Sequence, residues 1–339
     1  MLRRASILAL TVLIGAAVGC SRHEPTGADP AEEAYTALKS AWDAADTSEA
    51  KAALAEDYLS RFPNTEHSGT MAWRIAYYRG QDLADPARAW AAIAAALPAI
   101  EDPEQRFEAG MAGLSLAGST EVPLDLAEVA GALAAVRPLS FNENSDVADT
   151  AVELERWDLA ENYSRAALEL ATPDQLRADY PDAGYSDEQV ETRVRYRRAS
   201  RLAVNGWALF NLGEVGEAFA RFEEASAVGS ENFLGVPNNP LYRYWGRAAL
   251  TAGDHETAID LLGAETIFGQ DREAAEPYLR QAFATTTGGE EGYEEFLWAT
   301  RNRLARTAVD FELLDYEGTP HRLSDTAGKV TLLAFWFPT

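Results

Sequence analysis

One cysteine and four histidines are the side chains of this chain that could supply a thiol or an imidazole. Because Cys20 is the only cysteine, no internal disulfide, cysteine zinc site or Cys-x-x-Cys pair can form. His23, His67, His255 and His321 are scattered, and none has a carboxylate or a second histidine at metal-ligand spacing on a recognisable helix face. The sequence therefore predicts no catalytic residue, no cofactor and no metal site, and it assigns the histidines to surface or capping positions.

Charge and motif content exclude several further classes of function. The net charge of −25 disfavours nucleic-acid binding and docking to anionic lipid, which both require basic surface. The sequence contains no Gly-x-Gly-x-x-Gly, Walker, His-Glu-x-x-His or Gly-x-Ser-x-Gly motif. The glycine-rich stretch 288–292 carries two glutamates, whose carboxylates would repel a phosphate.

The basic cluster of the chain consists of Arg193, Arg195, Arg197, Arg198 and Arg201. Positions 193, 197 and 201 are spaced to share one face of a helix. Such a strip could dock an acidic peptide, but charge runs are usually solvated surface. We therefore favour a solvated face balanced by neighbouring acidic residues, namely Asp182, Asp187, Glu188 and Glu191.

The N-terminus has the features of a bacterial secretion signal. A basic start at residues 1–4 precedes an apolar run at residues 7–18, which is too short to span a bilayer comfortably. The run ends in Ala17-Val18-Gly19 directly before Cys20, and this order resembles the lipobox of bacterial lipoproteins.

The lipobox resemblance implies cleavage before Cys20 and attachment of lipid to its thiol, which would anchor the protein firmly to a membrane. We expect a signal peptide at residues 1–19 and a flexible tether at 20–30. The predicted location is the cell envelope, on a membrane and facing the periplasm, with inner and outer membrane left open.

Residues 31–303 are predicted to be helical, because alanine is abundant and glycine and proline punctuate the chain at intervals. One segment carries small residues at 206, 213, 218 and 225 with an aromatic residue at 222, which resembles the tetratricopeptide (TPR) spacing. Similar positions recur at Gly246, Gly253, Ala258 and Leu262, and more weakly at Ala148, Ala160 and Ala167 with Trp157 in the turn. The fold class is therefore mainly α, a TPR-like solenoid of about five to seven helical hairpins.

Most aromatic residues of the helical body are expected to fill its core rather than to form a ligand cage. Those on apolar helical stripes are Trp73, Tyr77, Trp90, Trp207, Phe222 and Trp245.

Residues 304–339 have a different pattern, typical of the start of an α/β domain. Residues 311–316 and 321–323 read as two short strands joined by the turn Glu317-Gly318, so we expect a hairpin. Residues 324–328 read as a turn or short helix. The apolar run 330–337 is typical of a central strand buried on both faces. We expect an incomplete α/β domain that consists of this first hairpin and the central strand.

This segment also resembles the start of the thioredoxin-like fold in bacterial membrane-tethered thiol–disulfide oxidoreductases (the TlpA/ResA type) and in redoxins and peroxiredoxins. The residues that carry the resemblance are Ala308-Val309-Asp310-Phe311, Asp315-Tyr316-Glu317-Gly318, Leu323-Ser324-Asp325, Gly328-Lys329 and Phe335-Trp336. In the oxidoreductases a Cys-x-x-Cys follows Phe-Trp after about three residues. That pair is missing from this chain, which is expected to be inactive as a redox enzyme.

The resemblance implies a lipid-anchored envelope thiol–disulfide oxidoreductase whose helical repeat domain binds protein or peptide partners. An alternative is a TPR-like lipoprotein scaffold without redox activity. A second alternative is a peroxide reductase of the redoxin or peroxiredoxin type, which uses a lone cysteine further along the chain. The sequence leaves these three open.

Overall fold

The structure is a computed structural model that describes residues 30–229, 236–305, 309–329 and 331. Its described residues are mostly helical, with one small two-stranded sheet near the C-terminal end, which confirms the mainly α prediction. The predicted signal peptide, Cys20 and most of the predicted strand 330–337 lie outside the described residues. No helix of the described part combines the length and apolar character needed to cross a membrane.

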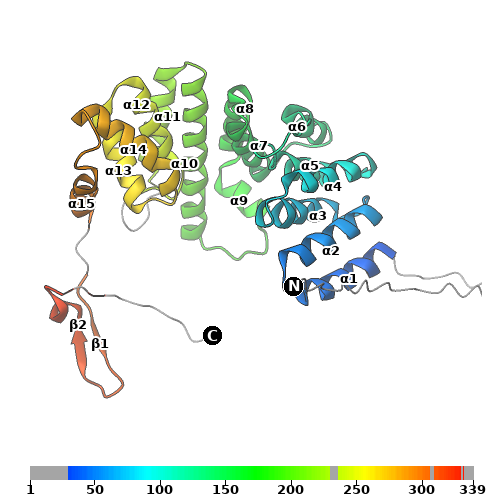
Figure 1. The fold of residues 1–339 in the computed structure, drawn as a ribbon, viewed down its shortest axis with the longest axis horizontal. Coiled ribbons are helices and arrows are strands. Elements are labelled where there is room, and N and C mark those ends of the chain that lie inside the picture. Colours follow the sequence, from blue (N-terminus) through cyan, green and yellow to red (C-terminus); the bar gives the residue numbers. More distant parts are fainter. Residues whose placement is uncertain (1–29, 230–235, 306–308, 330, 332–339) are drawn as a thin grey trace, which may run out of the picture.

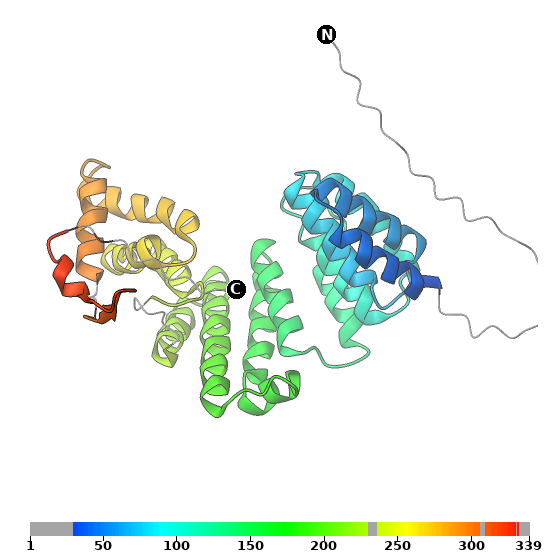
Figure 2. The same ribbon diagram turned by 90° about the horizontal axis from the view of Figure 1, so that it is seen from below.

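The helices follow one another along a curved array, with α1 at one end and α15 at the other (Figures 1 and 2). The first eight are α1 (Pro30–Asp43), α2 (Ser48–Arg61), α3 (Ser68–Ile75), α4 (Pro86–Ala96), α5 (Pro103–Leu114), α6 (Leu126–Ala134), α7 (Phe141–Glu153) and α8 (Trp157–Leu170). The remaining seven are α9 (Pro173–Asp179), α10 (Asp187–Asn211), α11 (Val215–Val228), α12 (Leu241–Ala252), α13 (His255–Phe268), α14 (Arg272–Thr287) and α15 (Tyr293–Leu304).

The hydrophobic core is a chain of overlapping clusters rather than one centre. One cluster joins α1 to α5, the next joins α5 to α8, a third surrounds α10, and a fourth joins α12 to α15. Neighbouring clusters share helices, so each helix covers an apolar face of the next. The core is therefore continuous only because each helix packs against the helices that follow it in the sequence.

Helix α3 continues as a π-helix, η1 (Ala76–Asp82), and a buried arginine ties this turn to α2. The guanidinium of Arg79 donates to Glu49 at 2.6 Å and to Glu56 at 2.7 Å, and only 3% of its side chain is exposed. These two carboxylates raise the pKa of Arg79 above its usual range. The pairing compensates the desolvation of a charge in the widened helical turn.

Helix α10 is the longest helix and lies near the middle of the array (Figure 1). It begins with a capping box, in which Ser186 and Gln189 bond to each other's backbone N–H. It packs against α7, α8, α9, α11 and α12, and its residues 199–209 are all buried. A helix enclosed on every side must satisfy each polar group inside the protein.

Small residues let paired helices approach closely at the positions that the sequence singled out. A Cβ atom at Gly206 of α10 would lie 2.8 Å from the Phe222 ring of α11, and one at Gly246 of α12 would lie 2.6 Å from Leu262 of α13. Gly206 and Gly246 lie 40 residues apart in the sequence, and so do Phe222 and Leu262. The same contact therefore recurs in successive helix pairs.

The turns that join the two helices of each pair share one backbone conformation. Gly213 and Gly253 end α10 and α12 with φ of 89° and 85°, the left-handed region that glycine adopts without strain. The turn between α7 and α8 has Glu155 in this conformation, with φ of 54°. Ala148 of α7 and Ala160 and Ala167 of α8 are fully buried, as predicted for the third and weakest copy.

The aromatic predictions are only partly right. Trp207 and Phe222 are buried core residues, and Trp90 and Trp245 are half-buried. Trp73 and Tyr77 are 42% and 50% exposed, so the prediction that they fill the core is wrong. Tyr77 lies in the π-helical turn η1, which departs from the 3.6-residue period on which the prediction relied, whereas Trp73 lies before that turn, on the exposed face of α3.

The predicted hairpin is present. Strand β1 (Glu312–Leu314) pairs antiparallel with β2 (Pro320–Arg322), with Leu313 opposite His321, and a 3₁₀-helix, η3 (Leu323–Thr326), follows. Gly318 supplies the turn with φ of 81°. Both strands are exposed along their length, and the hairpin lies beyond α15 at the end of the array (Figure 1).

Glu155 and Gly213 allow a paired stability test of the shared turn. Glu155→Gly should stabilise the fold by about 0.5–1 kcal/mol, because glycine relieves the strain of a left-handed residue. Gly213→Ala should destabilise it by about 1 kcal/mol for the same reason. Chemical denaturation of both variants measures the two changes, and shifts of the same sign would contradict the shared conformation.

Candidate functional site

Helix α10 carries the predicted basic cluster, and its arginines are not a solvated strip. Arg197 and Arg201 are 8% and 6% exposed. Arg197 donates to Asp179 of α9 at 2.9 Å, and Arg201 makes two bonds to Asp149 of α7 at 2.9 and 3.0 Å. The predicted solvated face is therefore wrong for these two residues, because the shared face of α10 turns towards α7 and α9.

The neutralising acids are also different from those predicted. Asp179 and Asp149 come from other helices, whereas Asp187 pairs with Arg177 at 2.6 Å. Arg193, the first member of the strip, is exposed and forms no ion pair with any described residue. The strip thus begins with Arg193, which is exposed and has no ion pair. It continues along α10 with Arg197 and Arg201, which form ion pairs inside the protein.

The first part of α10 forms one wall of an open hollow of about 860 Å³, which we call the tyrosine hollow. Its lining is aromatic and arginine-rich and comes from α7, α9, the 180–186 connection and α10. The lining residues are Phe141, Asn142, Leu176, Tyr180, Tyr185, Glu188, Gln189, Thr192, Arg193, Tyr196 and Arg197.

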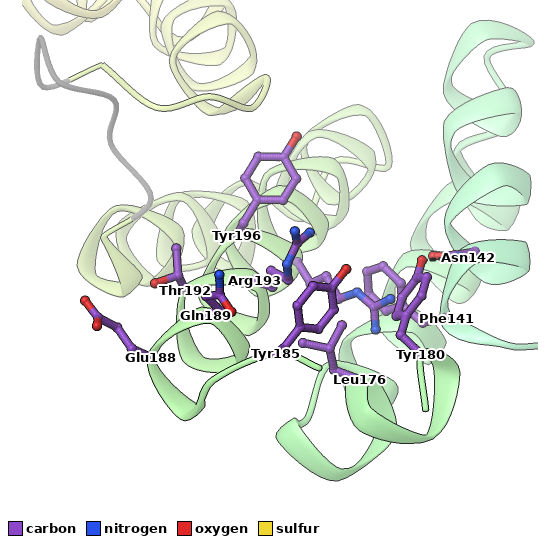
Figure 3. Close-up of a pocket in the computed structure, with 11 residues that line it drawn as sticks. Phe141, Asn142, Leu176, Tyr180, Tyr185, Glu188, Gln189, Thr192, Arg193 and Tyr196 are labelled. Atoms are coloured by element: carbon purple, nitrogen blue, oxygen red, sulfur yellow. Dashed lines mark hydrogen bonds between the residues drawn. The ribbon is translucent and has the colours of Figure 1, made fainter. Parts of the chain in front are cut away.

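Rings and guanidinium groups are stacked around the tyrosine hollow. Arg193 lies 4.3 Å from the centre of the Tyr185 ring, and Arg197 lies 4.2 Å from that of Phe141. Figure 3 shows the Arg193 side chain beside Tyr185, with Tyr180 further along next to Asn142 and Phe141. Asn142 donates to the Tyr180 hydroxyl at 3.3 Å, which fixes that ring beside α7. The hollow offers large flat contact surfaces, a positive charge without an ion pair at Arg193 and an exposed carboxylate at Glu188.

A second hollow of about 710 Å³ follows further along α10, and we call it the charged hollow. Tyr196 lines both hollows. The charged hollow is enclosed by α7, α10, α12, α13 and the loops before α12 and after α13. Its charged lining residues are Asp149, Glu153, Arg201, Arg243, Arg247, Glu265 and Asp271.

Two of the three arginines of the charged hollow are paired within it. Arg201 pairs with Asp149, and Arg243 pairs with Asp271. Arg247 instead lies between two aromatic rings, 4.4 Å from the centre of Trp207 and 4.3 Å from that of Tyr278. It forms no ion pair with a described residue, and burial lowers its pKa.

Glu265 of α13 is the most buried acid of the charged hollow, at 2% exposed. Its Oε1 accepts from the Asp271 backbone N–H at 3.3 Å, whereas its Oε2 is buried and has no hydrogen-bond partner. Burial raises its pKa to about 7, although Arg243 opposes this rise. Gly269 makes room for the carboxyl group, since a Cβ there would lie 2.3 Å from it.

A cluster of one histidine and two glutamates lies elsewhere, where α1 and α3 begin. His67 stacks on Tyr35 with 3.4 Å between ring centres, and its Nε2 lies 3.4 Å from Glu32 and 3.7 Å from Glu66. Their ligand atoms are close enough together for a metal ion. Sequence reasoning missed the cluster because Glu32 lies 35 residues from His67. Both glutamates are exposed, so the contacts also fit ordinary ion pairing.

The sequence found part of α10 but not the two hollows. It singled out Arg193, Arg197 and Arg201, while the tyrosines around 180–196 belong to no motif. The repeat contained a signal for the charged hollow. Glu265 lies 40 residues after Ala225, where the repeat calls for a small residue, and Arg247 occupies the place equivalent to Trp207.

The sequence matches no family model, and no curated protein or solved structure is significantly similar to it. Function must therefore be argued from the residues and geometry of the two hollows.

Glu265 makes stability depend on pH. Its pKa rises from 4.5 to about 7 on folding, so the folded chain binds more protons than the unfolded chain between these values. The contribution of Glu265 to the free energy of unfolding is therefore greatest below pH 4.5. It decreases by roughly 3 kcal/mol in total as the pH rises to 7. Glu265→Gln, which cannot titrate, should be more stable than the parent at pH 8 and close to it at pH 4.5.

Urea denaturation of both proteins between pH 4.5 and 8 measures this difference. Glu256→Gln, which removes an exposed carboxylate from the same helix, is the matched control and should show no comparable change with pH. If the free energies of unfolding of Glu265→Gln and the parent differ by the same amount at every pH in this range, the raised pKa of Glu265 is contradicted.

Proposed function

We propose that the helical body is a binding module for an extended segment of a partner protein, and that this segment docks in the tyrosine hollow. The observation that carries the proposal is the combination of aromatic rings with an exposed, unpaired Arg193 in an open hollow. Tyrosine and arginine are enriched at protein interfaces, because they supply large contact areas with a polar end.

The chemistry of the tyrosine hollow favours a segment with apolar or aromatic side chains and one acidic side chain. The rings of Tyr180, Tyr185 and Tyr196 offer apolar faces, while Arg193 can pair with a carboxylate. Because α10 is held by its neighbours over most of its length, one wall of the hollow is already in place before binding, which limits the entropic cost.

The repeated packing supports the proposal that the body is a TPR-like solenoid. Gly206 and Gly246 make equivalent close approaches, and Gly213, Gly253 and Glu155 share one turn conformation. Arrays of this kind present extended surfaces to protein partners.

Selection of a displayed random-peptide library on the full chain tests the docking proposal. Enriched peptides should combine aromatic or apolar residues with an acid. Tyr185→Ala and Arg193→Ala should each weaken their binding by about tenfold or more, since each removes a central contact. Fluorescence anisotropy with labelled peptides measures the affinities.

The control for this experiment is Tyr77→Ala, which removes an exposed tyrosine that does not line the hollow. Failure to enrich any peptide, or equal binding to the parent and both hollow variants, would refute docking in the tyrosine hollow.

We also propose that the protein is anchored to an envelope membrane through lipid on Cys20. The lipobox-like order before Cys20 supports this, and the net charge of −25 disfavours attachment to anionic lipid through protein charge alone. Cys20→Ala should move the protein from the membrane fraction to the soluble fraction of cells. Equal membrane association of both proteins, measured by fractionation, would count against lipidation.

A thiol–disulfide oxidoreductase is the second candidate function, and one contact favours it. Ser324 donates to Asp310 through its backbone N–H at 2.9 Å and its hydroxyl at 3.0 Å, while Leu323 N–H donates to Phe311 O. These bonds join two of the segments that resemble the thioredoxin-like fold. The coding DNA beyond codon 339 tests this candidate. A Cys-x-x-Cys within a few codons would favour dithiol exchange, a lone cysteine would favour peroxide reduction, and a stop codon would leave the scaffold.

A further inference from the structure

We propose that the charged hollow binds a small zwitterion, an α-amino acid or dipeptide whose carboxylate pairs with Arg247 and whose ammonium group pairs with Glu265. The inference goes beyond the proposed docking of a protein segment, which uses different residues in the tyrosine hollow. It rests on two groups of opposite chemistry that line one hollow, namely Arg247, which forms no ion pair with a described residue, and the buried Glu265, whose Oε2 has no hydrogen-bond partner.

Arg247 is the cationic half of the site. Its guanidinium carbon lies close to the Trp207 and Tyr278 rings, so two aromatic contacts hold it in place without a carboxylate partner. Contacts with ring faces do not use the N–H donors of the guanidinium, so these remain available for a ligand. A ligand carboxylate could accept two parallel bonds from this edge.

Glu265 is the acidic half. It is buried almost completely, yet its Oε2 has no partner, and a buried unpaired oxygen of this kind destabilises the fold. The Nε of Arg243, which lines the same hollow, is also buried without a hydrogen-bond partner. A ligand that hydrogen-bonds to both groups would remove the penalty that each of them imposes.

The charge inventory of the hollow selects a zwitterion over a simple ion. Arg201 and Arg243 are already neutralised by Asp149 and Asp271. Glu153, at the exposed edge of the hollow, has no ion-pair partner among the described residues but remains solvated. An anion at Arg247 would leave the carboxyl of Glu265 unpaired, and a cation at Glu265 would leave Arg247 unpaired. A molecule with both charges satisfies both groups, and the two charges of an α-amino acid or dipeptide are fixed a few ångströms apart.

The test is a thermal-shift screen of the full chain with each of the twenty common α-amino acids and with L-alanyl-L-alanine, at about 10 mM. At least one probe should raise the melting temperature, and titration calorimetry should give its affinity. The N-acetyl and the C-amide derivative of that probe should each bind about tenfold more weakly or worse, because each loses one charge.

Two variants locate the binding. Arg247→Met keeps an unbranched chain between the two rings, and Glu265→Gln keeps the acceptor for the Asp271 N–H, so both should fold, which circular dichroism checks. Each substitution should weaken the binding of the probe by about tenfold or more. Arg303→Met, which removes an exposed arginine outside the hollow, is the matched control and should bind as the parent does.

Three results would overturn the proposal. The first is that no probe binds. The second is that the blocked derivatives, acetate or methylammonium bind as tightly as the free probe. The third is that Arg247→Met and Glu265→Gln bind as the parent does.

Discussion

The complete enclosure of the middle of α10 is the constraint on which the rest of the structure depends. This stretch contains Arg201 and Asn205, so its polar groups must be satisfied by neighbouring helices. Asn205 donates to Glu161 O and to Ser164, and Arg201 donates to Asp149 and Ser145 O. These bonds fix α7 and α8 against α10 in one register, because a shift of either helix would leave a buried donor unpaired.

Close packing on the other side of α10 has a different origin. Gly206 admits the Phe222 ring, and the same geometry recurs where Gly246 admits Leu262. Close apolar contact therefore recurs between α10 and α11 and between α12 and α13, while buried ion pairing and hydrogen bonding are concentrated between α10 and α7. Both hollows are lined by α7 and α10, where arginine and tyrosine side chains stand in place of small residues.

The two hollows share Tyr196 but differ in how their charges are balanced. In the tyrosine hollow, Arg197 is neutralised internally and Arg193 remains at the surface. In the charged hollow, Arg247 and Glu265 are left without ion-pair partners among the described residues, at positions where the repeat has Trp207 and Ala225. The departures from the repeat thus coincide with unsatisfied groups, as expected when a regular scaffold carries a site.

The sequence by itself determined the helical class, the repeated small residues of the helix pairs and the C-terminal hairpin. These features depend on local spacing and backbone preference, which short stretches of chain contain. Only the tertiary structure decided that Arg197 and Arg201 are buried, that Trp73 is exposed and that Arg247 shares a hollow with Glu265. Burial and ion pairing depend on which helices meet, and residues such as Asp149 and Arg201 lie 52 positions apart. No local pattern contains that information.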